Sequence, residues 1–312
     1  MGQNRATDFV YRRMVRYSDC DASRNYYTPR AIEYSVEAVE EWCEELLGLS
    51  FIDLACQRRL ELRFLHMGSE FRKTLTAGEE VLARVCVAGI GDEQIRFLVS
   101  GENRAGELCF RAGLTACFAA CGGAEPVPIP PDCRDRIEHY RAKSGAMYSS
   151  AKRPVSTDCV PQPPAGVTGE LPFSLARRVV HGDCTPSGTI YPPRLFDYLL
   201  EALGVGYETF LGISWMEQNI LGRGQPFLQV SCDYLRPIGA GELISTSVVV
   251  SRLGRSSISY LLAGHNDDGA CCFVAQMAAC YSVDRDGAIK ATPFPDDLRG
   301  RIAAYSRGSI SV

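Results

Sequence analysis

The chain repeats itself once over most of its length. The segment FVYRRMVRYSDCD at residues 9–21 returns as FSLARRVVHGDCT at residues 173–185, so Asp19 and Asp183 correspond, 164 positions apart. A register that holds over about 130 residues indicates two copies of one domain rather than a solenoid of short repeats. Further pairs keep this register with a shift of one residue in either direction: Pro29 with Pro193, Gly91 with Gly254, Gly106 with Gly269, Arg134 with Arg299, and Tyr140 with Tyr305.

The repeat predicts two domains joined by a linker. A length of 312 residues suits two domains of about 150 residues each. Residues 144–172, between the copies, contain five prolines and little apolar periodicity, which is typical of an exposed linker. We therefore expect an N-terminal unit at residues 1–143, this proline-rich linker, and a C-terminal unit at residues 173–312.

Each copy shows the same order of predicted elements. In the first copy a strand over residues 10–17 leads to a tight turn, and a helix follows from about Pro29 to Leu47 and stops at Gly48. Apolar residues recur along this helix at helical spacing, namely Ile32, Val36, Val39, Cys43 and Leu46. Alternating apolar residues at 81–87 then predict a strand, and a last strand is expected over residues 110–119. The order predicts an α+β fold in which a mostly antiparallel sheet wraps one long central helix, twice, with the two units packed as a pseudo-dimer.

Composition narrows the classes of function. The net charge of −4 gives no reason to expect a nucleic acid or an anionic membrane as partner. No basic-apolar signal sequence and no apolar run of about 20 residues is found, so we expect a cytoplasmic protein. The 14 cysteines form no CxxC pair and only 4 histidines are present, so no metal site is expected.

The turn and the helix start carry a more specific pattern. Residues 18–42 read SDCDASRNYYTPRAIEYSVEAVEEW, in which an Asp-Cys-Asp turn precedes aromatic residues, a proline and an acidic helix position. This segment resembles the 4-hydroxybenzoyl-CoA thioesterase family of hotdog proteins, here in a tandem, double-hotdog form. The matching positions are Asp19, Cys20, Asp21, Tyr26, Tyr27, Pro29 and Glu33 in the first copy, and Gly182, Asp183, Cys184, Pro186, Gly188, Tyr191, Pro193 and Asp197 in the second.

The resemblance implies a thioesterase that releases a free acid from an acyl-CoA or an acyl carrier protein. No cofactor is then expected apart from the CoA or phosphopantetheine of the substrate itself. The resemblance places the catalytic carboxylate at Asp21 and the amide that polarises the thioester carbonyl at Thr28. A carboxylate beside a helix N-terminus suits this chemistry, because it attacks or activates water while unpaired amides stabilise the oxyanion. Nucleophilic and general-base routes both stay open.

The second copy departs from this pattern at both positions. Thr185 replaces Asp21, and threonine is not an anionic base. Pro192 replaces Thr28, and proline has no amide hydrogen to donate. The sequence therefore predicts one working site, in the first copy, and one degenerate copy that contributes walls and substrate contacts.

Several side chains are candidates for substrate or CoA contacts. Tyr26 and Tyr27 occupy the aromatic positions of the family, although packing is an open alternative. Glu33 fills the acidic family position, whereas Glu37 is more simply read as solvated helix face. The hairpin RLGRSSIS of the second copy resembles a basic family segment that holds CoA phosphates, and an acyl-CoA held there would reach Asp21. Its candidates are Arg252, Arg255, Ser256 and Ser257.

Other functions remain to be weighed against hydrolysis. An isolated aspartate in a turn is more often a capping residue than a catalyst. A hotdog dehydratase needs a histidine near the helix, and only His181 lies close to either turn, which disfavours that reaction. A non-hydrolytic acyl-binding or acyl-transferring protein stays open, and so does the identity of the acyl group. Exposed sheet edges also leave a homo-oligomer of double-hotdog chains open.

Overall fold

The computed structural model describes residues 9–144, 173–212, 214–285 and 288–309. The chain divides into two compact units, Met1–Cys159 with Thr185–Thr189, and Val160–Cys184 with Ile190–Val312. Apart from Ser144, the expected linker lies outside the described residues. Among the described residues, no helix has the length and apolar character needed to cross a membrane.

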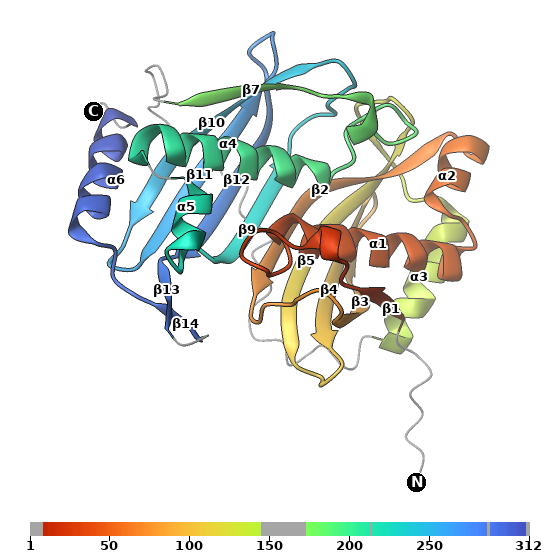
Figure 1. The fold of residues 1–312 in the computed structure, drawn as a ribbon. Coiled ribbons are helices and arrows are strands. Elements are labelled where there is room, and N and C mark those ends of the chain that lie inside the picture. The colour runs from red at the N-terminus through yellow and green to blue at the C-terminus, as the bar shows by residue number, and fades with distance from the viewer. Residues whose placement is uncertain (1–8, 145–172, 213, 286–287, 310–312) are drawn as a thin grey trace. The chain divides into compact units, whose positions relative to one another are not determined.

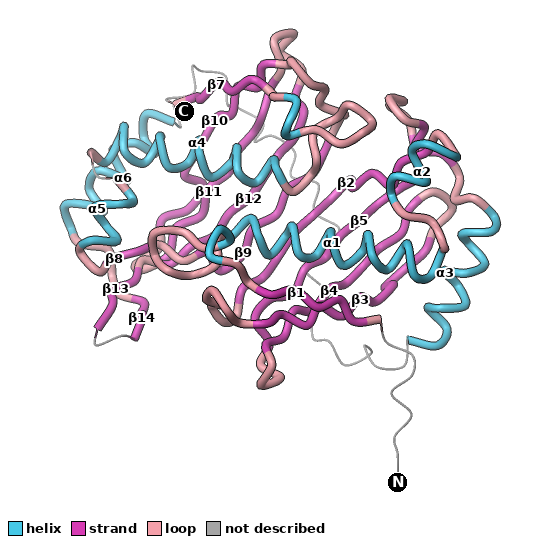
Figure 2. The backbone as a smooth tube through the Cα atoms, turned by 45° about the vertical axis from the view of Figure 1, so that its right-hand side comes forward, coloured by secondary structure: helices cyan, strands magenta, loops and turns pink. Residues whose placement is uncertain are grey.

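The first unit is an antiparallel sheet with one long helix lying across it (Figures 1 and 2). Its strands follow the order β1-β3-β4-β5-β2, and the short β6 pairs with β5. The elements are β1 (Val10–Met14), η1 (Tyr17–Asp19), α1 (Thr28–Leu47), α2 (Phe51–Gln57), β2 (Leu60–Phe71), β3 (Glu80–Ile90), β4 (Gln94–Asn103), β5 (Leu108–Ala120), β6 (Pro126–Val127) and α3 (Pro131–Ser144).

The central helix α1 confirms the predicted helix almost to the residue. Pro29 occupies its first turn, where a missing amide hydrogen costs nothing, and Gly48 ends it with a left-handed φ of 63°. The predicted apolar stripe is buried except for Leu46, which is partly exposed. The opposite side of α1 is buried as well, through Tyr34, Ala38 and Trp42. Only one face of α1, which includes Glu41, Glu44 and Glu45, is exposed, as expected for a helix that the sheet wraps on its other sides.

The second unit repeats this arrangement, with the strand order β7-β10-β11-β12-β9. Helix α4 lies across its sheet (Figure 1). The elements are β7 (Ser174–Arg178), η2 (His181–Asp183), α4 (Arg194–Leu211), α5 (Trp215–Ile220), β8 (Arg223–Gly224), β9 (Phe227–Tyr234), β10 (Leu243–Leu253), β11 (Ser257–His265), β12 (Cys271–Cys280), β13 (Ser282–Arg285), β14 (Ala288–Ala291) and α6 (Asp296–Ser309). Strands β14, β13 and β8 form a further small sheet.

Residues that correspond in the repeat form corresponding hydrogen bonds in the two units. Arg134 of α3 donates to the carbonyl of Gly91 over 2.8 Å, and Arg299 of α6 donates to that of Gly254 over 2.5 Å. The hydroxyl of Tyr140 likewise donates to the carbonyl of Val85 over 2.6 Å, and Tyr305 repeats this bond with Val248. The C-terminal helix of each unit is thus fastened to the sheet at the same two points.

The sequence prediction needs three corrections here. Strand β1 ends at Met14 rather than at residue 17, because Tyr17–Asp19 turn into a 3-10 helix. The single predicted helix per unit is joined by two more, α2 and α3 in the first unit and α5 and α6 in the second. Strand β2 was not foreseen, although it pairs with β5 over most of its length.

Candidate active site

The Asp-Cys-Asp segment forms a closed turn that leads into α1. Cys20 and Tyr26 face each other across an antiparallel bridge. Inside the bridge, the amide of Asp21 donates to the carbonyl of Asn25 over 3.0 Å, and the amide of Arg24 donates to the carbonyl of Asp21 over 3.0 Å. Arg24 takes a left-handed φ of 67° to close the turn. The backbone therefore fixes Asp21 at the start of a tight, fully bonded turn.

The side chain of Asp21 is exposed and half engaged. Its Oδ1 accepts hydrogen bonds from the amide of Ser23 over 2.8 Å and from the Ser23 hydroxyl over 2.5 Å. No partner is found for Oδ2 among the described residues. Ser23 thus holds the carboxylate in one orientation while leaving an oxygen free to attack or to bind water. Ser23 was missed by the sequence prediction, although a serine two residues after an aspartate is a known turn signal.

The start of α1 supplies an unpaired donor. Thr28 is the first residue of the helix, and within the described part of the chain its amide has no hydrogen-bond acceptor. Pro29 follows and carries no amide hydrogen, and Arg30 donates to the carbonyl of Tyr27 over 2.8 Å. An unpaired amide at a helix N-terminus, with the helix dipole behind it, favours a nearby anion. The amide predicted from the sequence is therefore present and available.

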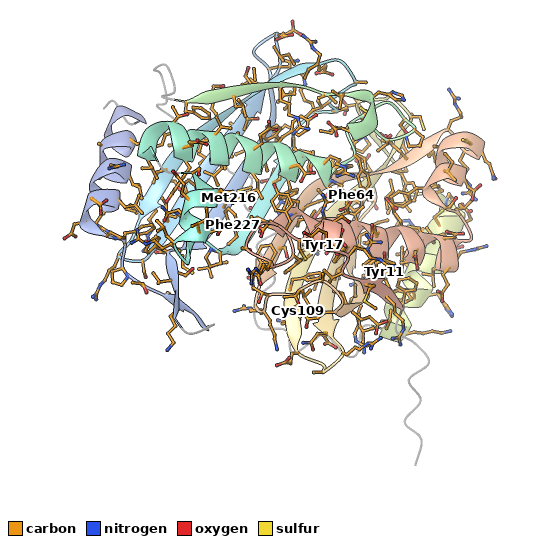
Figure 3. The ribbon with its side chains drawn as sticks, viewed as in Figure 1. Tyr11, Tyr17, Phe64, Cys109, Met216 and Phe227 are labelled. Atoms are coloured by element: carbon orange, nitrogen blue, oxygen red, sulfur yellow. The ribbon has the colours of Figure 1, made fainter. Side chains whose placement is uncertain are left out.

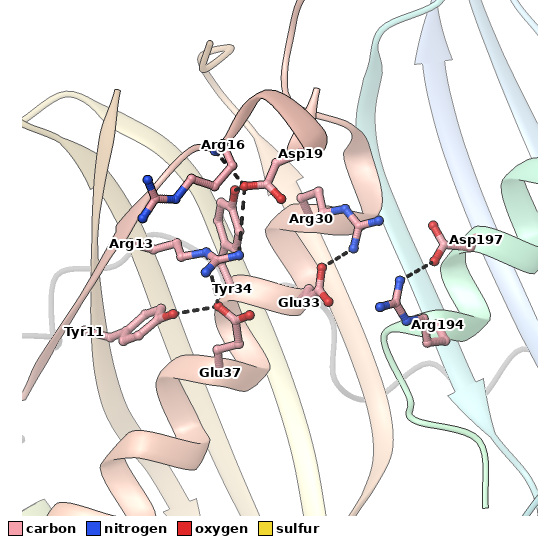
Figure 4. Close-up of polar contacts among 10 residues, drawn as sticks. All are labelled: Tyr11, Arg13, Arg16, Asp19, Arg30, Glu33, Tyr34, Glu37, Arg194 and Asp197. Carbon is pink, nitrogen blue, oxygen red and sulfur yellow. Dashed lines mark hydrogen bonds and ion pairs between the residues drawn. The ribbon is translucent and has the colours of Figure 1, made fainter. Parts of the chain in front are cut away.

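A buried carboxylate anchors the turn from below. Asp19 accepts from the amide of Arg16 over 2.7 Å and from the hydroxyl of Tyr34 over 2.8 Å (Figure 4). The carbonyl of Asp19 also accepts from the amide of Tyr27 over 2.7 Å, which ties the end of the turn to its beginning. Asp183 repeats the first kind of contact, because the hydroxyl of Tyr198 donates to it over 2.6 Å. The same bond in both units supports a structural role for these aspartates.

Glu37 joins the anchor through Arg13, which also lies 3.9 Å from Asp19, and Arg177 links Asp183 and Glu201 in the same way in the second unit. The Glu37 carboxylate accepts from the hydroxyl of Tyr11 over 2.6 Å and lies 3.6 Å from Nε of Arg13 (Figure 4). Burial raises the pKa of Glu37, and the bond from Tyr11 and the charge of Arg13 offset part of that rise. The solvated-face interpretation of Glu37 was wrong, since its side chain is mostly buried. In the second unit the position of Tyr11 is taken by Leu175, and Glu201 pairs with Arg177 near the surface.

Tyr26 and Tyr27, which follow the turn, differ in their burial. Tyr26 belongs to the core, where it packs with Val15, Leu75 and Phe110, and its hydroxyl has no hydrogen-bond partner among the described residues. This placement favours packing over substrate contact. Tyr27 is partly exposed and caps α1.

Glu33 is mostly buried and bonded to Arg30. The pair recurs as Arg194 with Asp197 at 3.5 Å in the second unit (Figure 4). Because an arginine partner holds the carboxylate at this position in both copies, the placement of Glu33 favours a structural role at the helix start over contact with a substrate.

An exposed aromatic residue next to the turn was not singled out from the sequence. Tyr17 opens η1 and is 90% exposed (Figure 3). An aromatic ring this exposed, four residues from Asp21, is available for contact with a substrate. No pattern in the sequence marks it, because its position in the repeat is held by His181.

The second copy of the repeat has the same turn, with Thr185 and Pro192 in place of Asp21 and Thr28, and its residues Thr185–Thr189 belong to the first compact unit. Cys184 and Ile190 form the bridge, the amide of Thr185 donates to the carbonyl of Thr189 over 2.7 Å, and Gly188 takes the left-handed φ, here 84°. The hydroxyl of Thr185 lies 3.4 Å from that of Thr189. Pro192 stands where Thr28 stands and offers no donor. The hydrogen bonds that close the turn are thus the same in both copies, whereas the carboxylate of Asp21 and the amide of Thr28 have no counterpart in the second.

The basic hairpin of the second unit is open to solvent. Arg252 ends the exposed part of β10, and Arg255 and Ser257 are exposed at the turn, whereas Ser256 is half-buried. No ion pair is found for either arginine in the described part of the chain. The carbonyls of Arg255 and Ser256 accept from Phe294 over 3.0 Å and from Tyr281 over 2.8 Å, so the backbone of the hairpin is fixed while its cationic side chains are free to bind an anion.

Two antiparallel sheets, each wrapped on one long helix, define a double-hotdog protein. The family model of the thioesterase superfamily matches residues 188–273, so the resemblance predicted from the turn motif is confirmed. Comparison with curated protein sequences finds no match.

Solved structures extend the fold match over nearly the whole chain. A protein described as an oleoyl thioesterase from Lactobacillus plantarum is 12% identical with a TM-score of 0.68, covering 89% of this chain and 97% of its own. A 12:0-ACP thioesterase from Umbellularia californica is 12% identical with a TM-score of 0.65, covering 88% and 94%. An acyl-ACP thioesterase from Bacteroides thetaiotaomicron is 8% identical with a TM-score of 0.61, covering 88% and 98%. At these identities the likeness shows the double-hotdog fold.

Proposed function

We propose that the chain is a thioesterase that hydrolyses an acyl-CoA or acyl-carrier-protein thioester to the free acid, using the Asp21 turn of the first unit. The observation that carries this proposal is that a carboxylate oxygen and a helix-start amide, seven residues apart in the chain, both lack a hydrogen-bond partner among the described residues. Asp21 offers an Oδ2 without a partner among the described residues, and Thr28 offers an amide in the same condition. The family match and the fold of named thioesterases support the same reaction class.

The two groups divide the reaction between them. Oδ2 of Asp21 attacks the thioester carbonyl carbon, or removes a proton from the water that does so. Negative charge then develops on the carbonyl oxygen, and the Thr28 amide with the α1 dipole stabilises it. On the general-base route, the proton that Asp21 takes from water passes to the leaving thiolate as the carbon–sulfur bond breaks, and the water oxygen stays in the acid. On the nucleophilic route, the thiolate leaves from an acyl–aspartyl anhydride, and hydrolysis of that anhydride restores Asp21, supplies the oxygen of the acid and provides the proton of the thiol. The bond from Ser23 keeps the carboxylate oriented throughout.

Replacing the carboxylate tests the base. Asp21→Asn keeps the size and the bond to Ser23, and it should lower kcat on a good acyl-CoA by about 10²- to 10⁴-fold while the substrate still binds. Release of free thiol, followed with DTNB, measures the rate. Thr185→Ala in the second unit is the matched control and should leave the rate unchanged. Equal rates for Asp21→Asn and the parent would rule out the assignment, and a large loss in Thr185→Ala would place the working site in the other unit.

Replacing the amide tests the oxyanion donor, and the chain itself supplies the variant. Thr28→Pro creates the Pro-Pro pair that the second unit already carries at Pro192 and Pro193, so the turn tolerates it. It removes one hydrogen and should lower kcat by about 10²- to 10³-fold. Thr28→Ala retains the amide and should keep the parent rate. A Thr28→Pro enzyme as fast as the parent would exclude this amide from the reaction.

The alternative is an acyl-binding or acyl-transferring protein that does not hydrolyse. It is favoured if the parent binds acyl thioesters but releases no thiol from any of them. Thiol release from a panel of acyl-CoA and acyl-carrier-protein substrates distinguishes hydrolysis from binding alone, and it shows which of the two kinds of thioester is cleaved faster.

A further inference from the structure

Arg13 of β1 lies between two carboxylates that belong to different elements. Its Nη2 is 3.9 Å from Oδ2 of Asp19 in η1, and its Nε is 3.6 Å from Oε2 of Glu37 in α1 (Figure 4). The guanidinium also lies over the ring of Tyr34. Nε is buried and has no hydrogen-bond partner among the described residues. The guanidinium is therefore held by the charges of the two acids and by the face of the tyrosine ring.

Strand β1 supplies a second side chain to this group. Tyr11 and Arg13 are two residues apart on β1, so they lie on the same face of the strand. The hydroxyl of Tyr11 donates to Oε2 of Glu37 over 2.6 Å, and the same oxygen faces Arg13. One carboxylate of α1 thus fixes both side chains of the strand. We call Tyr11, Arg13, Asp19, Tyr34 and Glu37 the Arg13 cluster.

Asp19 connects the Arg13 cluster to both reactive groups of the proposed site. Its side chain belongs to the cluster, and its backbone carbonyl accepts from the amide of Tyr27 over 2.7 Å. Tyr27 directly precedes Thr28, and Asp21 lies two residues after Asp19. A side chain that fixes Asp19 therefore also fixes the chain on both sides of the site. Misplacing a catalytic group by about 1 Å can lower a rate by about 10²-fold, so this support bears on the reaction.

The second copy repeats the cluster around Arg177. Arg177 lies 3.5 Å from Asp183, forms an ion pair with Glu201 and lies 3.8 Å from the centroid of the Tyr198 ring. On the proposed function, this cluster supports a turn that takes no direct part in the reaction, because threonine replaces the reactive aspartate there. The chain therefore contains a control in which the same support is present without the catalytic group.

The two clusters differ in how far solvent reaches them. Leu175 replaces Tyr11, so the second cluster lacks the phenol. The glutamate side chain is 24% exposed in the Arg13 cluster and 46% exposed in the second, and the aspartate side chain is 8% exposed against 15%. Water compensates the loss of a cation less well where the anions are more buried. The more enclosed cluster belongs to the copy of the turn that carries Asp21.

We propose that Arg13 is a positioning residue, which aligns the Asp21 carboxylate with the start of α1 by holding Asp19. The inference rests on the proposed function, because it requires that Asp21 and the Thr28 amide act on one thioester. Arg13 does not touch the substrate in this role. Without its guanidinium, the mostly buried carboxylates of Asp19 and Glu37 lose the cation between them, and their repulsion loosens the base of the turn.

Removing the charge is the first arm of the test. Arg13→Met in the full-length chain replaces the guanidinium by an apolar group on a side chain of similar reach. It should lower kcat on a good acyl-CoA by about tenfold or more and leave KM unchanged, because misalignment affects turnover rather than binding. Thiol release followed with DTNB measures both constants. A parent-like kcat in Arg13→Met would overturn the proposal.

The second copy provides the matched control. Arg177→Met makes the same change in the equivalent cluster. Both variants should lower the thermal midpoint, because each removes one partner from a group of charges, but only Arg13→Met should lower kcat. The rates are compared at a temperature well below both midpoints. An equal loss of kcat in the two variants would show a general effect of lowered stability, and the positioning role would be wrong.

Two milder variants keep the test decisive if Arg13→Met does not fold. Arg13→Lys retains a cation beside Asp19, and Tyr11→Leu installs the residue that the second unit carries at position 175. Each should lower kcat by a smaller factor, about two- to fivefold, with KM unchanged. Parent-like kcat values in both variants would contradict the proposal.

Amide hydrogen exchange tests the same inference without a substrate. Peptides that cover residues 19–27 should exchange faster in Arg13→Met than in the parent, because the amides of Asp21, Arg24 and Tyr27 are bonded within the turn. Arg177→Met should accelerate exchange over residues 183–191 instead. Unchanged exchange over residues 19–27 in Arg13→Met would show that the guanidinium does not hold the turn.

The two readouts keep this inference distinct from the proposed function. If the parent hydrolyses no thioester but Arg13→Met accelerates exchange in the turn, the hydrolase proposal fails and the support of the turn by Arg13 is upheld. If hydrolysis depends on Asp21 but Arg13→Met has the kcat and the exchange of the parent, the hydrolase is upheld and the positioning role fails.

Discussion

The hydroxyl of Tyr34 donates a 2.8 Å hydrogen bond to the buried carboxylate of Asp19, and this bond holds the turn that carries Asp21 onto the central helix. The guanidinium of Arg13 lies over the same tyrosine ring, 5.3 Å from its centroid. Asp19 and Asp21 are separated by a single cysteine but differ in their surroundings. Asp19 is buried and hydrogen-bonded, whereas Asp21 is exposed and its Oδ2 has no partner among the described residues.

Removing the inner aspartate should damage the fold first. Asp19→Ala leaves the Tyr34 hydroxyl and the Arg16 amide without their acceptor, and it should lower the free energy of unfolding by about 2–3 kcal/mol. Asp21→Asn should change it by less than about 1 kcal/mol, because that side chain is exposed. Urea unfolding followed by tryptophan fluorescence makes the comparison. An Asp19→Ala protein as stable as the parent would show that the anchor is dispensable.

The left-handed residue of the first turn should be open to stabilisation. Arg24 adopts φ 67° where the second unit uses Gly188, and a left-handed conformation costs a residue with a Cβ about 1–2 kcal/mol. Arg24→Gly should therefore raise the thermal midpoint by about 2–4 °C. Gly188→Ala is the converse variant and should lower it. A midpoint that falls in Arg24→Gly would mean that the arginine side chain contributes more than its backbone costs.

Burial of Trp42 should make it one of the most sensitive core positions. Trp42→Ala opens a cavity between Phe97 and Tyr140 and should cost about 3–5 kcal/mol of stability. Trp42→Phe should cost much less, because the indole nitrogen has no hydrogen-bond partner among the described residues and only volume is lost. Denaturant midpoints of the two variants test this order, and equal midpoints would contradict it.

Glu37 should make stability depend on pH in a known direction. Its pKa is raised in the folded state by burial, so its contribution is full below the ordinary pKa of glutamate and is lost as pH rises through the folded pKa. Glu37→Gln cannot ionise and should lose this slope. The free energy of unfolding of the parent should therefore decrease relative to that of the variant as pH increases above the ordinary pKa of glutamate. Unfolding free energies across that range measure the difference, and equal pH slopes in the parent and in Glu37→Gln would contradict the prediction.

The hairpin arginines should affect substrate affinity rather than turnover. We propose that these arginines hold the CoA phosphates, so Arg252→Ser and Arg255→Ser should each raise KM for acyl-CoA by about tenfold with kcat unchanged. Arg236→Ser removes an exposed arginine from another loop and should have no such effect. If neither hairpin variant changes KM, the hairpin is a solvated tip and the substrate is held elsewhere.

Much of the fold was predictable because the repeat and the central helix leave strong local signals. Pro29, Gly48 and the apolar stripe between them specify α1, and the alternation in β3 and β5 specifies strands. Helix α3 was not predictable in the same way. Half of its sequence, PDCRDRIEHYRAKS, is charged. Its buried face consists of Cys133, Ile137 and Tyr140 only, and Tyr140 bonds to Val85, which is distant in the chain.

The candidate site was predictable in its chemistry but not in its supports. The family motif predicts Asp21 and Thr28, and the sequence shows directly that Thr185 and Pro192 replace them in the second copy. The role of Ser23 depends on a turn geometry that no local pattern specifies fully. The burial of Glu37 depends on Tyr11, which reaches it from another element and is therefore invisible to helical periodicity.

The shared backbone of the two turns bears on how such a chain evolves. Both turns close through the same bridge and the same amide–carbonyl bonds, so the copies differ there by their side chains and by the start of the helix, which lies at Thr28 in α1 and at Arg194 in α4. On the proposed function, a second working site would require an aspartate at position 185 and an amide-bearing residue at position 192. After such a duplication, one copy can acquire substitutions that change specificity while the other copy retains its function.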